Sequence, residues 1–262
     1  MAVSSSSKTI LVIGPGPRRA VGEDQFAHAV VSACTAFRAE GHKVVLLDNA
    51  PYLALPTDIR GIQRRVEPLT PEVIHNVEAQ MAVDRVYADA GGSGAQRLAL
   101  TASLTASRKA SNTVRLGAGP QTTAAALDRG RLFAHIEAAG LTAPPHAFAE
   151  TVAAALEAAQ EIDFPLQATL VPRRAQQLAD DDRKPMDRGA FDPAVAVTKS
   201  PLPPALLYNI SDLNEWAEQQ LEIHSEEMLL LEKANLDWQR FEVIVLQDGA
   251  GDQAIVGLQA YL

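Results

Sequence analysis

Glycines follow several of the short apolar runs that are typical of β-strands in this 262-residue sequence. Gly14 and Gly16 follow the run at residues 9–13, and Gly91 and Gly92 follow a later one. Ligands of open α/β sheets bind at the carboxyl ends of the strands, and glycine lets the backbone approach a ligand closely. These glycines are therefore candidate ligand loops. The alternative is that they form tight strand-to-helix turns that bind nothing.

The first glycine pair does not complete a dinucleotide-binding fingerprint. In the motif G-x-G-x-x-G, the glycines bring a helix N-terminus close to a pyrophosphate. Here Pro17 and the pair Arg18 and Arg19 fill the later positions of that motif. The pattern therefore does not imply a nicotinamide cofactor.

Histidine and cysteine form no metal-binding pattern. The six histidines are scattered, and neither His-x-x-x-His nor Cys-x-x-Cys spacing occurs, so we predict no metal site. The single cysteine, Cys34, lies in an apolar-periodic stretch, which favours a buried small side chain over a nucleophile. One cysteine excludes an intramolecular disulfide and fits a reducing compartment.

The composition is that of a folded, acidic protein. Hydrophobic residues make up 47% of the chain and charged residues 21%, which is enough apolar material for a sizeable core. The net charge of −9 should repel the phosphates of nucleic acids. The apolar run at residues 10–13 is too short for a signal peptide or a membrane span. We expect a cytoplasmic protein that binds neither nucleic acid nor a membrane.

Residues 1–119 predict an α/β domain with a parallel sheet, because strand and helix patterns alternate strictly there. The predicted strands are 9–13, 43–47, 85–87 and 113–116, and the predicted helices are 24–40, 71–82 and 94–109.

Residues 120–262 predict a smaller α+β lobe. Its predicted helices are 121–127, 131–139, 152–161 and 211–220, and its strands are 165–170, 228–232 and a hairpin at 240–258. The long polar segment at residues 172–204 shows little periodicity, and such loops are usually disordered or serve as lids. We expect it to be poorly ordered, or ordered only by a contact outside the domain.

Several segments together resemble the large chain of carbamoyl phosphate synthetase, in its amino-terminal, carboxyphosphate-forming half. The similar segments are residues 8–17, 41–47, 67–70, 128–129 and 164–165. Gly91-Gly92 stands where that family has a Gly-Gly-Gln-Thr loop. The resemblance implies a Rossmann-like pre-ATP-grasp domain at residues 1–119, followed by a partial ATP-grasp lobe at residues 120–262.

The resemblance also implies a nucleotide site. Arg129 matches an arginine that contacts nucleotide phosphate, a role that suits the fixed fork of guanidinium donors. Glu232 and Lys233 match the ATP-grasp hinge beside the adenine, and Glu242 also has a counterpart. The alternatives are an ordinary arginine at a helix start for Arg129 and an ordinary charged strand end for Glu232 and Lys233.

The departures from the family concern charge. Where the family carries a phosphate-contacting Arg or Lys on a strand, this chain has Gln167 and Thr169, and the next glycine comes only at Gly189. The family's ribose-side acidic residue corresponds to Arg240. Its metal-binding Glu and Asn lie beyond the hairpin, whereas this sequence ends at Leu262.

Three hypotheses follow for the function. The first is a catalytically incomplete relative that binds a nucleotide or small metabolite, or a protein partner, with ATP bound weakly if at all. The second is an ATP-dependent ligase subunit whose magnesium site is completed by another chain or by a second copy. The third is metabolite binding through the Gly14 and Gly91 loops, without ATP-grasp chemistry.

Overall fold

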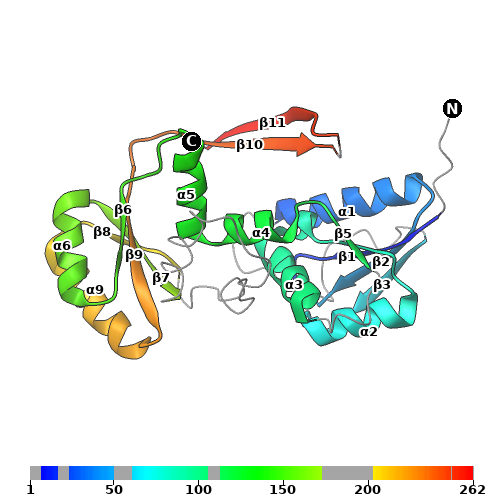
Figure 1. Ribbon diagram of the computed structural model, residues 1–262, viewed down its shortest axis with the longest axis horizontal. Coiled ribbons are helices and arrows are strands. Elements are labelled where there is room, and N and C mark those ends of the chain that lie inside the picture. Colours follow the sequence, from blue (N-terminus) through cyan, green and yellow to red (C-terminus); the bar gives the residue numbers. More distant parts are fainter. Residues whose placement is uncertain are drawn as a thin grey trace. The chain divides into compact units, whose positions relative to one another are not determined.

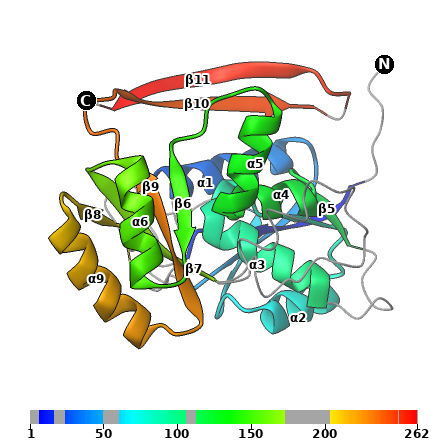
Figure 2. The same cartoon turned by 60° about the vertical axis from the view of Figure 1, so that its left-hand side comes forward.

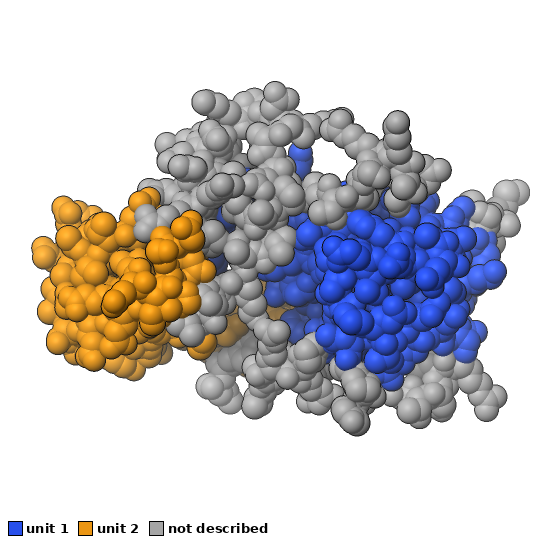
Figure 3. Space-filling model, turned by 90° about the horizontal axis from the view of Figure 1, so that it is seen from below, with its two compact units in different colours: residues 1–143, 172–199 blue, residues 144–171, 200–262 orange. Residues whose placement is uncertain are grey.

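The computed structural model describes residues 7–16, 24–49, 61–105, 113–172, 203–248 and 250–261. The chain forms two compact units (Figure 3). The first unit comprises residues 1–143 and 172–199, and the second comprises residues 144–171 and 200–262. The predicted polar segment at 172–204 lies almost entirely outside the described residues.

Two short helices group with the first unit, although the sequence analysis began the second lobe at residue 120. They are α4 (Pro120–Leu127) and α5 (Arg129–Ala138). The helix α4 packs against both α5 and α3 (Gly92–Thr105). In addition, Arg97 of α3 donates a hydrogen bond of 2.9 Å to the carbonyl of Leu127. These contacts tie residues 120–138 to the first sheet.

The first unit contains a five-stranded parallel sheet with the strand order β3-β2-β1-β4-β5. Its strands are β1 (Thr9–Ile13), β2 (Lys43–Asp48), β3 (Ile62–Val66), β4 (Arg85–Tyr87) and β5 (Val114–Leu116). The predicted parallel sheet is confirmed. The sequence analysis missed β3, because the polar segment Gln-Arg-Arg at its centre breaks the apolar pattern of a strand. Such a segment is tolerated only on an edge strand, which is where β3 lies.

Helices cover both faces of this sheet, as predicted (Figure 1). The helix α1 (Asp24–Ala39) packs on one face, and α2 (Pro71–Met81) and α3 pack on the other. Successive strand residues point to opposite faces, so the wholly apolar strand β1 contributes to both cores. The start of α2 is capped by Thr70, whose hydroxyl accepts from the amide of Val73 at 3.3 Å.

The second unit is built on a four-stranded sheet with the order β6-β9-β7-β8. The strands are β6 (His146–Ala149), β7 (Leu166–Pro172), β8 (Ala205–Leu207) and β9 (Glu227–Lys233). The pairs β6–β9 and β7–β8 are antiparallel, so this unit is the expected α+β lobe. The sequence analysis missed β6, which has four residues and directly follows two prolines.

The helices α6 (Val152–Ile162) and α9 (Ile210–Ile223) lie beside each other on one face of this sheet (Figure 2). Both begin with a capping side chain. The hydroxyl of Thr151 accepts from the amide of Ala154 at 3.2 Å, and the amide oxygen of Asn209 accepts from the amide of Asp212 at 3.0 Å.

The chain closes with the predicted hairpin of β10 (Arg240–Gln247) and β11 (Gln253–Tyr261), which forms a separate two-stranded sheet. The pairing shifts register between Ile244 and Val245, which marks a β-bulge in β11. None of the helices in the described part of the chain is both long and apolar enough to cross a membrane.

Cys34 on α1 packs in the core between α1 and the sheet, and its side chain is inaccessible to solvent. Burial raises the pKa of its thiol from 9.0 to about 12.

We therefore predict negligible alkylation by iodoacetamide at pH 8 in the folded protein and rapid alkylation in urea. Since the unfolded thiol ionises first, folding stability should also fall as the pH rises from 9 towards 12. Fast labelling of the native protein would contradict this burial.

Candidate functional site

Gly14 and Gly91 lie together at the carboxyl edge of the first sheet, where the sequence analysis placed ligand loops. The amide of Gly14 donates to the carbonyl of Leu47 at 2.8 Å, and a Cβ on Gly14 would lie 2.8 Å from Cγ of Asp48. A Cβ on Gly91 would lie 2.6 Å from the carbonyl oxygen of Ile13. Both glycines therefore let parts of the protein itself approach closely.

Gly16 and Gly92 adopt positive φ angles of 77° and 76°. Glycine adopts this conformation without the steric cost that a side chain would bring. A Cβ on Gly92 would lie 3.2 Å from the ring of Phe26, and one on Gly16 would lie 3.3 Å from Leu69. The described contacts account for these glycines through turns and packing, while their role as ligand loops stays a prediction.

A polar cluster that the sequence analysis missed lies at the same edge, around Asp89. Its Oδ2 accepts from the amide of Ala118 at 3.0 Å, and its Oδ1 lies 3.8 Å from Nη2 of Arg115. Burial lowers the pKa of Arg115, and the charge of Asp89 opposes that shift. Gly117 packs so closely against Asp89 that a side chain would collide with the carboxylate. This pair ties the end of β5 to the loop after β4.

Arg129 is the first residue of α5. The carboxylate of the preceding residue, Asp128, caps this helix by accepting from the amide of Arg131 at 3.0 Å. The guanidinium carbon of Arg129, an exposed residue, lies 5.0 Å from the centre of the Phe133 ring, a cation–π contact that orients the guanidinium. A cation at a helix N-terminus, where backbone amides also point outward, is a suitable arrangement for an anion.

Lys233 ends β9 and uses its amino group within the second unit. Its Nζ donates to the carbonyl oxygen of Phe164 at 2.6 Å and to that of Asp163 at 3.2 Å. Its backbone amide donates to the carbonyl of Pro145 at 2.9 Å. The side chain therefore holds the turn that leads into β7, where Asp163 has a φ of 68°.

Glu232 lies on the face of the second sheet that α6 and α9 do not cover. Leu229 and Leu231 pack with these helices, so Met228, Leu230 and Glu232 point to the opposite face. Glu232 is 5% exposed and is paired in register with His146 of β6.

Gln167 and Thr169 share that face with Glu232. Their neighbours Leu166, Ala168 and Leu170 all pack with the helices, so the alternation of β7 turns Gln167 and Thr169 to the opposite side. The strand on which the resemblance implies a phosphate-binding cation therefore presents two neutral side chains on this face.

Glu242 lies on β10, opposite Gln259, and is partly buried. Arg240 lies two residues earlier, opposite Tyr261. Arg129 belongs to the first unit, whereas Glu232, Lys233 and Glu242 belong to the second, and each is described within its own unit. The nucleotide site that would combine them stays a prediction.

The described residues contain no group of three or more His, Cys, Asp or Glu side chains that could hold a metal ion. The acidic residues of the candidate site therefore do not fit a magnesium–triphosphate centre by themselves, because such a centre needs several oxygen ligands around the ion.

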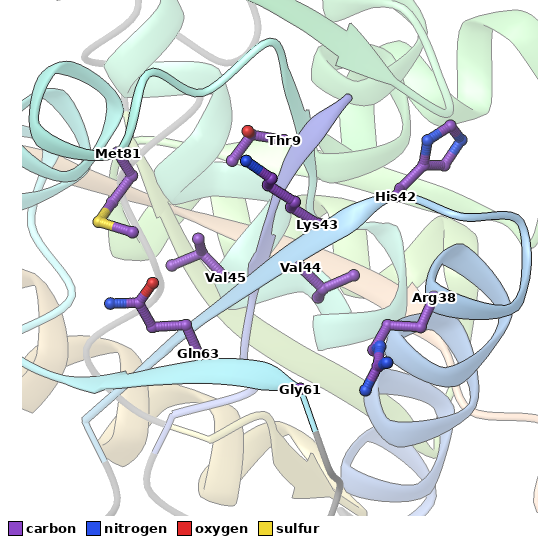
Figure 4. A pocket seen from close by; sticks show the side chains of 9 residues that line it. All are labelled: Thr9, Arg38, His42, Lys43, Val44, Val45, Gly61, Gln63 and Met81. Atoms are coloured by element: carbon purple, nitrogen blue, oxygen red, sulfur yellow. The ribbon is translucent and has the colours of Figure 1, made fainter. Parts of the chain in front are cut away.

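A cavity of about 430 Å³ lies at the opposite, amino-terminal edge of the first sheet (Figure 4). Its lining includes Thr9, Arg38, His42, Lys43 and Gly61. Lys43 points toward Thr9, whereas Arg38 lies beside Gly61, so the two cations do not converge (Figure 4). The sequence analysis did not predict this cavity.

Several known proteins are similar to this chain. Residues 6–124 match the carbamoyl phosphate synthase preATP-grasp domain. The chain is 27% identical over 248 residues to the carbamoyl phosphate synthase large chain of Pasteurella multocida, covering 95% of this chain and 21% of the relative. It is 24% identical over 249 residues to the N-terminal section of that large chain from Aquifex aeolicus, covering 95% of this chain and 40% of the relative.

A solved structure supports the same class of fold. The ADP complex of purK, an N5-carboxyaminoimidazole ribonucleotide synthetase, superposes with a TM-score of 0.60 at 17% identity, over 98% of this chain and 54% of that one. The expected fold of a Rossmann-like domain followed by a partial ATP-grasp lobe is confirmed. The chain is similar to the amino-terminal part of the carbamoyl phosphate synthase large chain, and it spans less than half of the curated relatives named above.

The glycine contacts can be tested with a matched pair of substitutions. Gly91→Ala should lower the free energy of unfolding by about 1–3 kcal/mol, because its Cβ would press on the carbonyl oxygen of Ile13. Gly94→Ala, on α3 with no atom within 4 Å of the new Cβ, should be neutral or stabilise by up to about 1 kcal/mol. Urea denaturation measures both values. Equal stability of the two variants would leave Gly91 without a packing role.

Proposed function

We propose that this chain is a carbamoyl phosphate synthase large-chain-like protein that binds a nucleotide or small metabolite and is catalytically incomplete by itself. The observation that carries this proposal is the neutral face of β7. Gln167 and Thr169 lie on the side of the second sheet that carries Glu232, and neither can offer a positive charge to a phosphate.

The engagement of Lys233 supports the same proposal. Its ammonium group donates to the carbonyl oxygens of Asp163 and Phe164, so a phosphate would have to compete with two hydrogen bonds that the fold already makes. Phosphoryl transfer depends on positive charge and on metal ions that stabilise the charge developing on the transferred group. The described residues offer a phosphate little positive charge and few ligands for a metal ion.

Within this proposal Arg129 contacts the phosphates, and Glu232, Lys233 and Glu242 lie around the base and ribose. Arg129 is an exposed residue at a helix N-terminus, an arrangement that suits an anion. Apolar neighbours such as Leu230 beside Glu232 suit a flat, uncharged base. Binding of ATP would be weak, because one arginine supplies most of the positive charge that faces the phosphates.

A second candidate function is that of an ATP-dependent ligase subunit completed by another polypeptide. It is favoured by the length of the relatives, since the chain matches only 40% of the Aquifex N-terminal section. In that case the other polypeptide would supply the acidic ligands for magnesium and the missing cationic contact. Either role is consistent with a location in the cytoplasm.

Titration calorimetry with ATP tests the binding role. We expect a dissociation constant of roughly 0.1–1 mM. Arg129→Ala should weaken binding about tenfold or more, because it removes a hydrogen-bonding cation from the phosphates. Arg38→Ala removes an exposed arginine at the opposite edge of the first sheet and serves as the control, with affinity unchanged. An equal loss of ATP affinity in both variants, or no loss in either, would show that Arg129 does not belong to the site.

A phosphate-release assay with ATP, magnesium and bicarbonate tests the catalytic role. The isolated chain should release no phosphate above the buffer rate, because each missing electrostatic contact costs a factor of about 10²–10³ in rate. Turnover that follows the purified protein through chromatography and disappears in both Arg129→Ala and Glu232→Ala would contradict catalytic incompleteness. Such turnover would favour the ligase.

A further inference from the structure

A single residue, Asp128, joins the helices α4 and α5. Its backbone is extended, with φ −107° and ψ 119°, and its amide donates to the carbonyl of Ala124 in α4 at 3.1 Å. Its own carbonyl accepts from the amide of Leu132 in α5 at 2.9 Å. One residue thus takes part in the hydrogen bonding of both helices. Figure 1 shows α5 turning away from α4 at this point, so the backbone angles of Asp128 set the direction of α5.

Arg97 of α3 contacts both sides of this junction. Its Nη2 donates to the carbonyl of Leu127, the last residue of α4, at 2.9 Å. Burial lowers the pKa of Arg97, and the negative charge of Asp128 opposes that shift, so the two charges lie close enough to interact. A partly buried cation has lost part of its hydration and is stabilised by such partners. The guanidinium therefore fixes Leu127 and Asp128 relative to α3.

The residue after the junction is Arg129, the cation that the proposed function places at the phosphates. Phe133, one turn further along α5, is 2% exposed, and the centre of its ring lies 5.0 Å from the guanidinium carbon of Arg129. Because Phe133 is packed in the protein, its ring gives the guanidinium a fixed surface for the cation–π contact. The start of α5 and this ring together determine where the guanidinium lies.

We propose that Arg97 is a positioning residue for anion binding, which orients Arg129 by fixing the junction between α4 and α5. The inference rests on the proposed function for the role of Arg129 at the phosphates, whereas the positioning itself lies within the first unit. A cation that is held in place before the ligand arrives loses less conformational entropy on binding than a mobile one. Affinity for an anion should therefore depend on Arg97, although Arg97 itself does not touch the anion.

The placement of Arg129 can be measured by NMR without any ligand. In the natural chain the ring current of Phe133 should shift the side-chain proton signals of Arg129 upfield, and Phe133→Leu should remove that shift. Arg97→Met keeps the length of the side chain and loses its charge and donors, so it should also lose most of the shift. Arg97→Lys keeps a cationic donor and should restore part of it.

Arg65→Met is the matched control. Arg65 is another arginine of the first unit, and its Nη2 donates to Oε1 of Gln80 at 3.2 Å, away from the junction. Its replacement should leave the Arg129 signals unchanged. In every variant, a Cys34 that stays protected from iodoacetamide shows that the first unit is folded.

Calorimetry with ATP measures the consequence for binding. Arg97→Met should weaken ATP binding about fivefold, whereas Arg65→Met should leave it unchanged. In an Arg129→Ala background, Arg97→Met should cause no further loss of affinity, because its effect acts through Arg129. A role in stability alone would lower the free energy of unfolding and leave both the Arg129 signals and the affinity of the folded protein unchanged.

The two measurements separate this inference from the proposed function. If the natural chain does not bind ATP, the proposed function fails, and the NMR shift still decides whether Arg97 positions Arg129. If ATP binding depends on Arg129 while Arg97→Met and Arg97→Lys change neither the shift nor the affinity, the proposed function stands and the positioning role is overturned. The same loss of affinity from Arg97→Met with and without Arg129 would also overturn it.

Discussion

The structure of the first unit depends on the burial of one strand, β1, on both of its faces. Leu11 and Ile13 pack with α2 and α3, and Ile10 and Val12 pack with α1. These four side chains are at most 2% exposed, and each contributes about 1.5–3 kcal/mol when fully buried. A strand in this position must have neighbours on both edges and helices on both faces, which is the doubly wound arrangement observed.

The same constraint explains the glycines at the end of β1. Because β1 is central, the loops that follow it and its neighbours converge at one edge of the sheet. Gly14 lies against Asp48 from β2, and Gly91 lies against the carbonyl oxygen of Ile13. At these two glycines, other atoms of the protein therefore fill the space that a ligand would need beside the backbone.

The sequence predicted the alternation of strands and helices because local periodicity reports burial on one or two faces of an element. It missed β3 and β6, whose few residues carry little pattern and are strands only because β2 and β9 lie beside them. It also found glycines and charged residues but could not show their contacts. Lys233 and Phe164 are 69 residues apart in the chain, and Arg115 and Asp89 meet only through the sheet order.

Under the proposed function, the departures from the family affect turnover more than binding. A ligand is held by contacts that are equal in the ground state and the transition state, whereas rate depends on contacts that strengthen in the transition state. Arg129 and the apolar neighbours of Glu232 belong to the first kind. A cation on β7 and a metal site belong to the second, because they neutralise charge as the phosphoryl group moves. On this proposal, neutral Gln167 and Thr169 would lower the rate of turnover while leaving the fold and a weak nucleotide site intact.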